Sequence, residues 1–321
     1  MGAHPGSHFD YREEASARIR PKPLQPGDRL AVLGGSSPTS VSVEELTAAV
    51  RKMGLEPVLY PSATAKHGYL SGSDAMRAAD INAAFADDSI QGIVTTRGGY
   101  GFHRILPLLD WKNIKKHPKL FGGYSDVTAM LTALNQICNM EACHMPMVGA
   151  WSGDGLDDYS LSFVKAMLFG EPVEYCNPEG QPLTTLVPGK AKGRLCGGNL
   201  SLLAASMGTP YEIDTKGKIL FIEEVGEPPY KVDGLLTNLR NGGKFDDCAG
   251  ILLGGFTDCR EKNDPATGLT LEEVFRELIV PAGKPTMSGV VCGHCSPSMA
   301  LPMGRLFKMD ADKGTFGPVK K

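Results

Sequence analysis

Blocks of apolar and polar positions alternate through the first half of the chain and predict strands and helices in turn. Short apolar runs bounded by glycine or proline predict buried strands, and apolar residues that recur every three or four positions predict helices. The predicted strands cover residues 30–33, 56–60, 92–96 and 120–124. The predicted helices cover residues 42–53, 73–86 and 127–136. This order favours an α/β domain with a parallel sheet, whose reactive loops follow the carboxyl ends of the strands.

The pattern changes in the second half of the chain. Residues 149–192 combine frequent Gly, Asp, Pro and Thr with weak periodicity, apart from a helix near residues 160–168. An α+β pattern then begins, with predicted strands at 218–225, at 250–253 and ending near Cys292, and predicted helices at 230–241 and 270–279. We therefore expect a flexible leader, an N-terminal domain, a linker and a smaller C-terminal domain over residues 1–20, 21–148, 149–192 and 193–321.

Composition and charge exclude several classes of protein. The 321 residues carry 33 Lys and Arg against 36 Asp and Glu, and a formal net charge of −3 offers no field that attracts nucleic acid or an anionic membrane. No apolar run approaches the ~18 residues of a membrane helix, and the first residues lack the apolar stretch of a secretory signal. We expect a soluble cytoplasmic protein whose 8 cysteines are mostly reduced.

Ser125 lies between a predicted buried strand and a predicted helix, which is the placement of a nucleophile elbow. Such a turn exposes the serine hydroxyl and aims the next amide at a developing oxyanion. The match to G-x-S-x-G is partial, because Val127 occupies the last position. A serine that only caps the helix would show the same local pattern, so both interpretations stay open here.

A glycine-rich run, Thr96-Arg97-Gly98-Gly99-Tyr100-Gly101, follows the third predicted strand. Its glycines allow close approach of the backbone to a ligand, and one of their amides could serve as an oxyanion donor. A tight turn without a ligand is an equally good interpretation. The pattern G-x-G-x-x-G is absent, which argues against a dinucleotide cofactor.

Histidines and glutamates near strand ends are candidates for acid and base chemistry. His294 lies in a turn after an apolar strand and suits a general base, with His144 as the competing candidate and a structural histidine as the alternative. Glu223, Glu224 and Glu227 lie on or just beyond the predicted strand 218–225. One of them could orient a histidine ring, although solvated glutamates would look the same.

Cys292 and Cys295 have C-x-x-C spacing, and Cys138, Cys143 and His144 form a second small group. A four-thiolate zinc site needs a second C-x-x-C pair, and the chain has none. We therefore expect no structural metal.

Six motifs stand in order along nearly the whole chain. They lie within residues 22–28, 96–101, 121–126, 193–200, 223–230 and 293–304. With them the chain resembles the serine LD-carboxypeptidase family, which includes muramoyl-tetrapeptide carboxypeptidases and the microcin C immunity peptidases. The resemblance implies a first domain similar to class I glutamine amidotransferases. It also implies a cytoplasmic homodimer without metal or organic cofactor.

The resemblance further implies a triad of Ser125, Glu223 and His294 at the interface between the domains. By the same resemblance, the oxyanion donors are the amide of Asp126 and one from Gly98 or Gly99. Many relatives have an aspartate after the catalytic glutamate where this chain has Glu224, so Glu224 is the alternative acid.

The implied reaction is hydrolysis of the L,D amide bond before the terminal D-alanine of cell-wall muropeptide tetrapeptides. The leaving D-alanine carries a carboxylate, for which Arg97 is a candidate partner. A microcin C-type peptidase that acts on peptidyl or aminoacyl nucleotides is the alternative, with Trp151, Tyr159 and Phe163 as aromatic residues that could stack on a nucleobase. A non-catalytic homologue that binds muropeptides is the third possibility.

Overall fold

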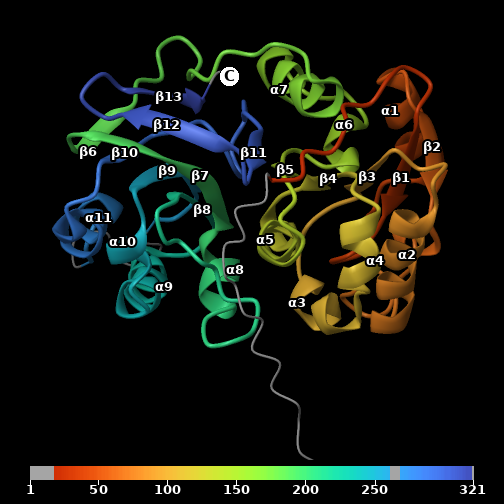
Figure 1. Ribbon diagram of the computed structural model, residues 1–321, viewed down its shortest axis with the longest axis horizontal. Helices are drawn as coiled ribbons and strands as arrows, with labels where there is room; N and C mark the ends of the chain where they lie inside the picture. Colours follow the sequence, from red (N-terminus) through yellow and green to blue (C-terminus); the bar gives the residue numbers. More distant parts are fainter. Residues whose placement is uncertain (1–17, 261–267, 320–321) are drawn as a thin grey trace, which may run out of the picture.

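The computed structural model describes residues 18–260 and 268–319 and folds them into two lobes, each built around one sheet (Figure 1). The first lobe holds the red to yellow part of the chain together with the blue strand β11, and the second holds the cyan part and the rest of the blue part. The predicted α/β class is confirmed. The leader expected over residues 1–20 falls mainly on residues 1–17, which lie outside the described residues.

The first lobe contains a six-stranded sheet in the order β11-β5-β4-β3-β1-β2. Five of these strands are parallel, and the edge strand β11 runs antiparallel to β5. The strands are β1 (Arg29–Leu33), β2 (Glu56–Leu59), β3 (Gly92–Thr95), β4 (Leu120–Gly123), β5 (Ala142–His144) and β11 (Leu301–Met303). Both faces of the sheet are covered by helices, which explains why the central strands are apolar without alternation.

The helices and 3₁₀ turns of the first lobe confirm the predicted helices to within one or two residues. They are α1 (Val43–Lys52), η1 (Pro61–Ala63), α2 (Asp74–Ala86), α3 (Phe102–Ile105), η2 (Leu106–Leu108), α4 (Trp111–Lys116), η3 (Ser125–Val127), α5 (Thr128–Ile137), α6 (Val148–Trp151) and α7 (Asp158–Phe169). Helix α1 begins with a capping box, in which the Ser42 hydroxyl accepts from the amide of Glu45 at 3.2 Å and the Glu45 carboxylate accepts from the amide of Ser42 at 2.9 Å.

The second lobe contains a seven-stranded mixed sheet in the order β13-β12-β7-β8-β9-β10-β6. Its strands are β6 (Thr184–Val187), β7 (Lys190–Asn199), β8 (Ile219–Val225), β9 (Gly250–Thr257), β10 (Thr286–Ser288), β12 (Leu306–Asp310) and β13 (Thr315–Pro318). The helices and 3₁₀ turn are α8 (Leu200–Ala205), α9 (Pro229–Asn241), α10 (Lys244–Asp247), α11 (Leu271–Leu278) and η4 (Val280–Ala282).

Three features of the second half differ from the sequence pattern. Strand β6 lies within the segment expected as a linker, yet it pairs with β10. Strand β11 lies late in the chain, yet it pairs with β5 of the first lobe. The prediction of a strand that ends near Cys292 is wrong, because β10 ends at Ser288 and Gly289 then turns the backbone with a φ of +83°.

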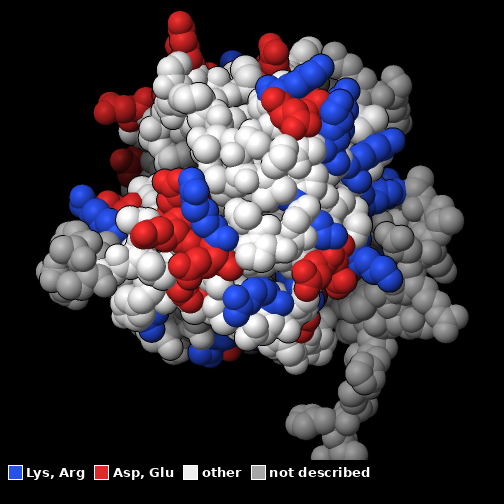
Figure 2. All heavy atoms as spheres, turned by 90° about the vertical axis from the view of Figure 1, so that its left-hand side faces the viewer, with Lys and Arg blue, Asp and Glu red and all other residues white. Residues whose placement is uncertain are grey.

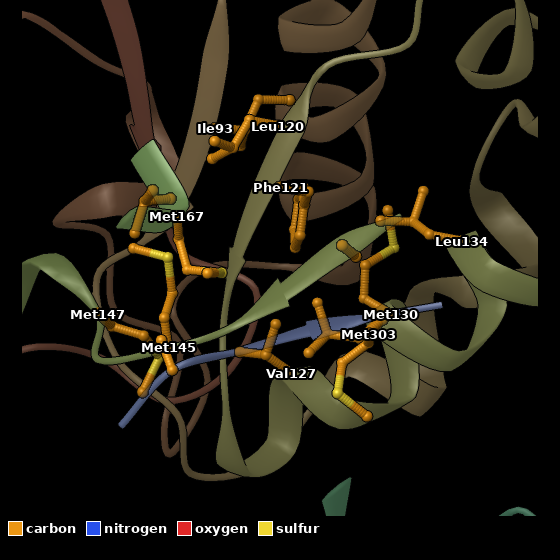
Figure 3. Close-up of a cluster of buried hydrophobic side chains, with 14 of the residues drawn as sticks. Ile93, Leu120, Phe121, Val127, Met130, Leu134, Met145, Met147, Met167 and Met303 are labelled. Carbon is orange, nitrogen blue, oxygen red and sulfur yellow. The ribbon is translucent and has the colours of Figure 1, made fainter. Parts of the chain in front are cut away.

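Helix α5 packs its apolar side into the core behind β4. Figure 3 shows Val127, Met130 and Leu134 in one buried cluster with Phe121 of β4 and Met303 of β11. Because Met303 comes from the second half of the chain, this core joins distant parts of the sequence. The turn between β4 and α5 is therefore attached to two elements that pack in a dense core.

The surface of the second lobe carries both signs of charge. Figure 2 views the left-hand side of Figure 1, and there acidic and basic side chains lie beside one another with uncharged areas between them. On α11, for example, the Arg276 guanidinium lies 2.7 Å from the Glu272 carboxylate. Within residues 18–260 and 268–319, no helix is long and apolar enough to cross a membrane.

Candidate active site

Ser125 occupies a sharp turn between β4 and α5. Its φ is +63°, in the left-handed region that is costly for a residue with a side chain, by roughly 1–3 kcal/mol. An N-cap residue has extended backbone instead, and Tyr124 has that conformation here. The geometry therefore matches a nucleophile elbow and differs from that of a simple helix cap.

The loop after β3 lies directly against Ser125. A Cβ atom added to Gly98 would come within 2.7 Å of the Ser125 Cβ and 2.9 Å of its Oγ, so only glycine allows this approach. The amide of Ser37 donates to the Gly98 carbonyl at 3.3 Å, and the amide of Tyr100 donates to the Ser37 hydroxyl at 3.2 Å. These bonds hold the loops after β1 and β3 together beside the serine.

Glu223 and His294 form a buried pair on the second lobe. The Glu223 carboxylate, which is fully buried on β8, lies 2.7 Å from His294 Nδ1 and also accepts from the His294 amide at 3.1 Å. This contact fixes both the ring and the backbone of His294. A proton on Nδ1 leaves Nε2 available to accept another, as a general base requires.

Tyr124 connects the two lobes at this point. It directly precedes Ser125, and its ring centroid lies 4.8 Å from that of His294. Burial, followed by the charge of Glu223, raises the pKa of Tyr124 to about 12, so the phenol is neutral at pH 7. Tyr124, the neighbour of Ser125, thus contacts the histidine that Glu223 holds on the second lobe.

Glu224, the neighbour of Glu223 on β8, points to a different environment. Its carboxylate accepts from the Ser201 amide and hydroxyl at 2.8 and 2.7 Å, and from Asn199 Nδ2 at 3.1 Å. These partners begin helix α8, so Glu224 satisfies its first turn. Glu227 lies half-buried in the turn after β8.

His144 is enclosed beside the site. Its ring lies 5.8 Å from that of Tyr124 and 5.3 Å from that of Phe221, measured between centroids. Neither ring nitrogen has a hydrogen-bond partner within the described part of the chain. Burial lowers the pKa of His144 to about 3, which makes it a poor general base compared with a histidine held by a carboxylate.

Two comparisons establish the family of this chain. The family model of the LD-carboxypeptidase N-terminal domain matches residues 30–145, and that of the LD-carboxypeptidase C-terminal domain matches residues 192–309. The probable murein peptide carboxypeptidase of Bacillus subtilis is 41% identical over 308 residues and covers 94% of each chain. The chain belongs to the LD-carboxypeptidase family. The predicted resemblance and the prediction of a peptidase are confirmed.

Other similar proteins support the assignment of this chain to the LD-carboxypeptidase family and fold. The murein tetrapeptide carboxypeptidase of Pseudomonas aeruginosa is 29% identical, over 90% of this chain and 95% of its own. The crystal structure of muramoyltetrapeptide carboxypeptidase from Oxalobacter formigenes has a TM-score of 0.76 at 25% identity, over 90% of this chain and 97% of the other. MccF in complex with glutamyl sulfamoyl guanosine has a TM-score of 0.84 at 23% identity, over 94% and 98%, which shows the same fold.

Arg97, Cys292 and Cys295 are further residues of this LD-carboxypeptidase that the sequence offered for substrate or metal binding. Arg97 is exposed at the end of β3, where its guanidinium donates to the Gly98 and Pro38 carbonyls at 3.3 and 3.4 Å. Burial raises the pKa of the Cys292 and Cys295 thiols above the ordinary value. Across residues 18–260 and 268–319, no group of three or more His, Cys, Asp or Glu side chains could hold a metal ion.

Two aromatic side chains proposed for nucleobase stacking are buried. Trp151 donates from its indole to the Pro146 carbonyl at 3.0 Å, and Phe163 lies in the hydrophobic core. Tyr159 packs on Phe163, with 5.0 Å between ring centroids. Neither Trp151 nor Phe163 can stack on a ligand in this conformation.

Tyr124, Ser36 and Ser37 lie in the loops after the strand ends, where the sequence predicts the function, but no individual role was assigned to them. The contacts that involve them join separate loops, and no local pattern in the sequence shows such contacts.

Proposed function

We propose that this protein is a serine carboxypeptidase that hydrolyses the L,D amide bond before the terminal D-alanine of muropeptide tetrapeptides. The observation that carries the proposal is the Glu223 and His294 pair, set against the Ser125 elbow through Tyr124. The similarity to murein peptide carboxypeptidases supports the substrate class.

The residues divide the chemistry as in other serine hydrolases. His294 Nε2 takes the proton of the Ser125 hydroxyl, and the serine oxygen attacks the amide carbonyl. His294 then returns the proton to the leaving amine, and D-alanine departs. Water attacks the acyl-enzyme by the same proton transfers, which releases the shortened peptide and restores the serine. Glu223 orients the imidazole and stabilises its protonated form.

The negative oxygen of the tetrahedral intermediate needs hydrogen-bond donors. The amide of Asp126, next to the nucleophile, is one candidate, and the amide of Gly98 or Gly99 is the other. The contact of Gly98 with Ser125 supports this assignment. Arg97 stands at the rim of the same loop, where its guanidinium could bind the carboxylate of the D-alanine.

The protein would act in the cytoplasm on recycled cell-wall peptides, as a homodimer and without metal or organic cofactor. These parts of the proposal rest on the family resemblance. The net charge of −3 and the mixed charges of Figure 2 agree with a small peptide as the substrate and with no nucleic-acid or membrane partner.

One experiment separates the candidate functions. The protein is incubated with a purified muropeptide tetrapeptide and, separately, with a peptidyl adenylate, and the products are identified by mass spectrometry. We expect the tetrapeptide to lose one D-alanine and the adenylate to remain intact, because Trp151 and Phe163 are buried. Cleavage of the adenylate alone would assign the protein to the microcin C-type peptidases. No cleavage of either compound would indicate the binding homologue.

A further inference from the structure

The loops after β1 and β3 are held by two buried charged side chains that the reaction described above does not use. Asp126 is 1% exposed, and Arg77 of α2 is 0% exposed. Charged side chains are rarely this buried unless their hydrogen bonds are satisfied. The side-chain bonds of Asp126 reach the loops beside Ser125, and so do the two bonds of Arg77 Nη1. Arg77 Nη2 donates to the Asp74 carboxylate at 2.5 Å, on the same helix.

The Asp126 carboxylate ties the elbow to both loops. Its Oδ2 accepts from the Ser36 hydroxyl at 2.7 Å and from the Phe102 amide at 2.9 Å. Ser36 follows β1 and Phe102 follows the glycine-rich run after β3. The residue next to the nucleophile therefore holds the start of one loop and the end of the other.

The Arg77 guanidinium reaches the same loops from α2. Its Nη1 donates to the Gly35 carbonyl at 2.5 Å and to the Gly101 carbonyl at 3.0 Å. Gly101 and Phe102 share one peptide unit, so Arg77 binds the carbonyl of that unit and Asp126 binds its N–H. Two side chains of opposite charge thus fix the rotation of a single peptide plane.

This peptide plane ends the run that contains the candidate oxyanion donors. Gly98, Gly99 and Gly101 have wide conformational freedom, and a run rich in glycine does not hold one orientation by itself. Donors stabilise an oxyanion best when they are already oriented before the reaction. Ser37 restrains the middle of the run through Gly98 and Tyr100, and the two charged residues restrain its end.

We propose that Asp126 and Arg77 are positioning residues, whose side chains hold the glycine-rich loop so that a Gly98 or Gly99 amide faces the oxyanion formed at Ser125. This inference rests on the proposed serine peptidase function. Asp126 then has two roles: its backbone amide is a candidate oxyanion donor, and its side chain holds the loop. Arg77, far from Ser125 in the sequence, then has a role in transition-state stabilisation.

The inference predicts an effect on kcat with little effect on substrate binding. Loss of one oxyanion donor costs about 10²–10³ in kcat, and a loosened donor should cost less. For Asp126→Ala and Arg77→Met we expect kcat to fall by about 10- to 100-fold and KM to change by less than about threefold. Asp126→Asn keeps an acceptor oxygen for the Phe102 amide and should lose less activity than Asp126→Ala.

The experiment measures kcat and KM with the muropeptide tetrapeptide, and the rate at which a fluorophosphonate labels Ser125. Labelling forms an Oγ–P bond, expels fluoride and passes the serine proton to His294. The phosphonyl oxygen of the reagent occupies the oxyanion position, so the labelling rate should fall together with kcat. Arg276→Met is the matched control, because Arg276 makes an exposed ion pair with Glu272 on α11 of the second lobe. We expect this control to behave like the wild type in both assays.

Thermal unfolding of each variant separates loss of fold from loss of orientation. If Asp126→Ala or Arg77→Met does not fold, two milder variants carry the test: Ser36→Ala removes one contact of Asp126, and Asp126→Asn removes its charge. Folded variants with wild-type kcat and labelling would overturn the inference. So would a rise in KM at constant kcat, since that result would assign the loop to substrate binding.

The labelling assay also separates this inference from the proposed substrate. A wild-type protein that labels at Ser125 but leaves the tetrapeptide intact would refute the substrate, and the labelling rates of the variants would still decide the inference. A wild-type protein that does not label at Ser125 would refute both.

Discussion

In the first lobe the candidate site is built from backbone geometry, whereas in the second lobe it is built from two ionisable side chains. The first lobe contributes a serine at a φ of +63° and a glycine loop pressed against it. The second contributes a carboxylate and an imidazole 2.7 Å apart. The turn at Ser125 follows from the local chemistry of the strand and helix that flank it. The approach of the Gly98 loop and the pair of Glu223 and His294 depend on residues that only the folded chain brings together.

Replacement of Ser125, on the first lobe, should have the largest effect on activity. Ser125→Ala should lower kcat/KM by at least about 10⁴-fold, because no other hydroxyl takes its place on the elbow. Turnover is measured by release of D-alanine, and circular dichroism checks the fold. Activity within about tenfold of the wild type would remove Ser125 from the mechanism.

Replacement of His294 should have the next largest effect, and it tests which histidine is the general base. His294→Gln should lower kcat by at least about 10³-fold, because the proton acceptor is lost. His144→Gln is the matched control and should keep most of the activity, since the enclosed ring of His144 faces Tyr124 and Phe221. Kinetics of both purified variants give the ranking. The opposite ranking would transfer the role of base to His144.

Replacement of Glu223 should lower activity, whereas replacement of its neighbour Glu224 should mainly lower stability. Glu223→Gln should lower kcat by about 10²-fold or more with little change in KM, through loss of imidazolium stabilisation. Glu224→Gln should cost less than about tenfold in kcat, but about 1–3 kcal/mol of stability, because it weakens the bonds to Ser201 and Asn199. Steady-state kinetics and urea unfolding measure the two effects. A larger loss of kcat in the Glu224 variant would reassign the acid.

A smaller effect concerns the strain of the elbow. Ser125→Gly should be more stable than Ser125→Ala by about 1 kcal/mol, because glycine adopts a positive φ without the steric cost of a Cβ. Both variants lack the hydroxyl, so the comparison isolates the backbone. Equal unfolding midpoints in urea would show that the turn stores no strain.

The last effect is the acid sensitivity of folding caused by His144. Its pKa is about 3 in the folded protein, against 6.5 as the ordinary value. The unfolded chain therefore binds a proton that the folded chain does not as the pH falls below 6.5, and the free energy of unfolding decreases towards pH 3. His144→Gln should show a weaker decrease between about pH 6.5 and 5. Urea unfolding at several pH values tests this, and identical slopes would contradict it.

Most elements of the first lobe and the order of the candidate residues could be predicted from local signals in the sequence. Apolar periodicity located β1 to β4 and helices α1, α2 and α5, and the capping box located the start of α1. These signals are local, because they arise from the 3.6-residue and 2-residue periods and from side chains that bond their own turns. The position of Ser125 after a buried strand is of the same kind.

Only the tertiary structure decided how Glu223 and Glu224 differ. Successive residues of a strand point to opposite faces, so Glu223 and Glu224 must face apart, but both faces of this strand are apolar in sequence and the alternation does not choose between them. The contacts with His294 on one side and with α8 on the other distinguish them.

The same holds for β11, which pairs with the first sheet from the far end of the chain, and for Arg77, which reaches two loops from α2. His144 was a candidate general base from its position in the sequence, but burial in the folded chain lowers its pKa and makes it a poor base. In each case the deciding contact joins residues far apart in the sequence. Packing and desolvation in the folded chain create such contacts, and no local pattern records them.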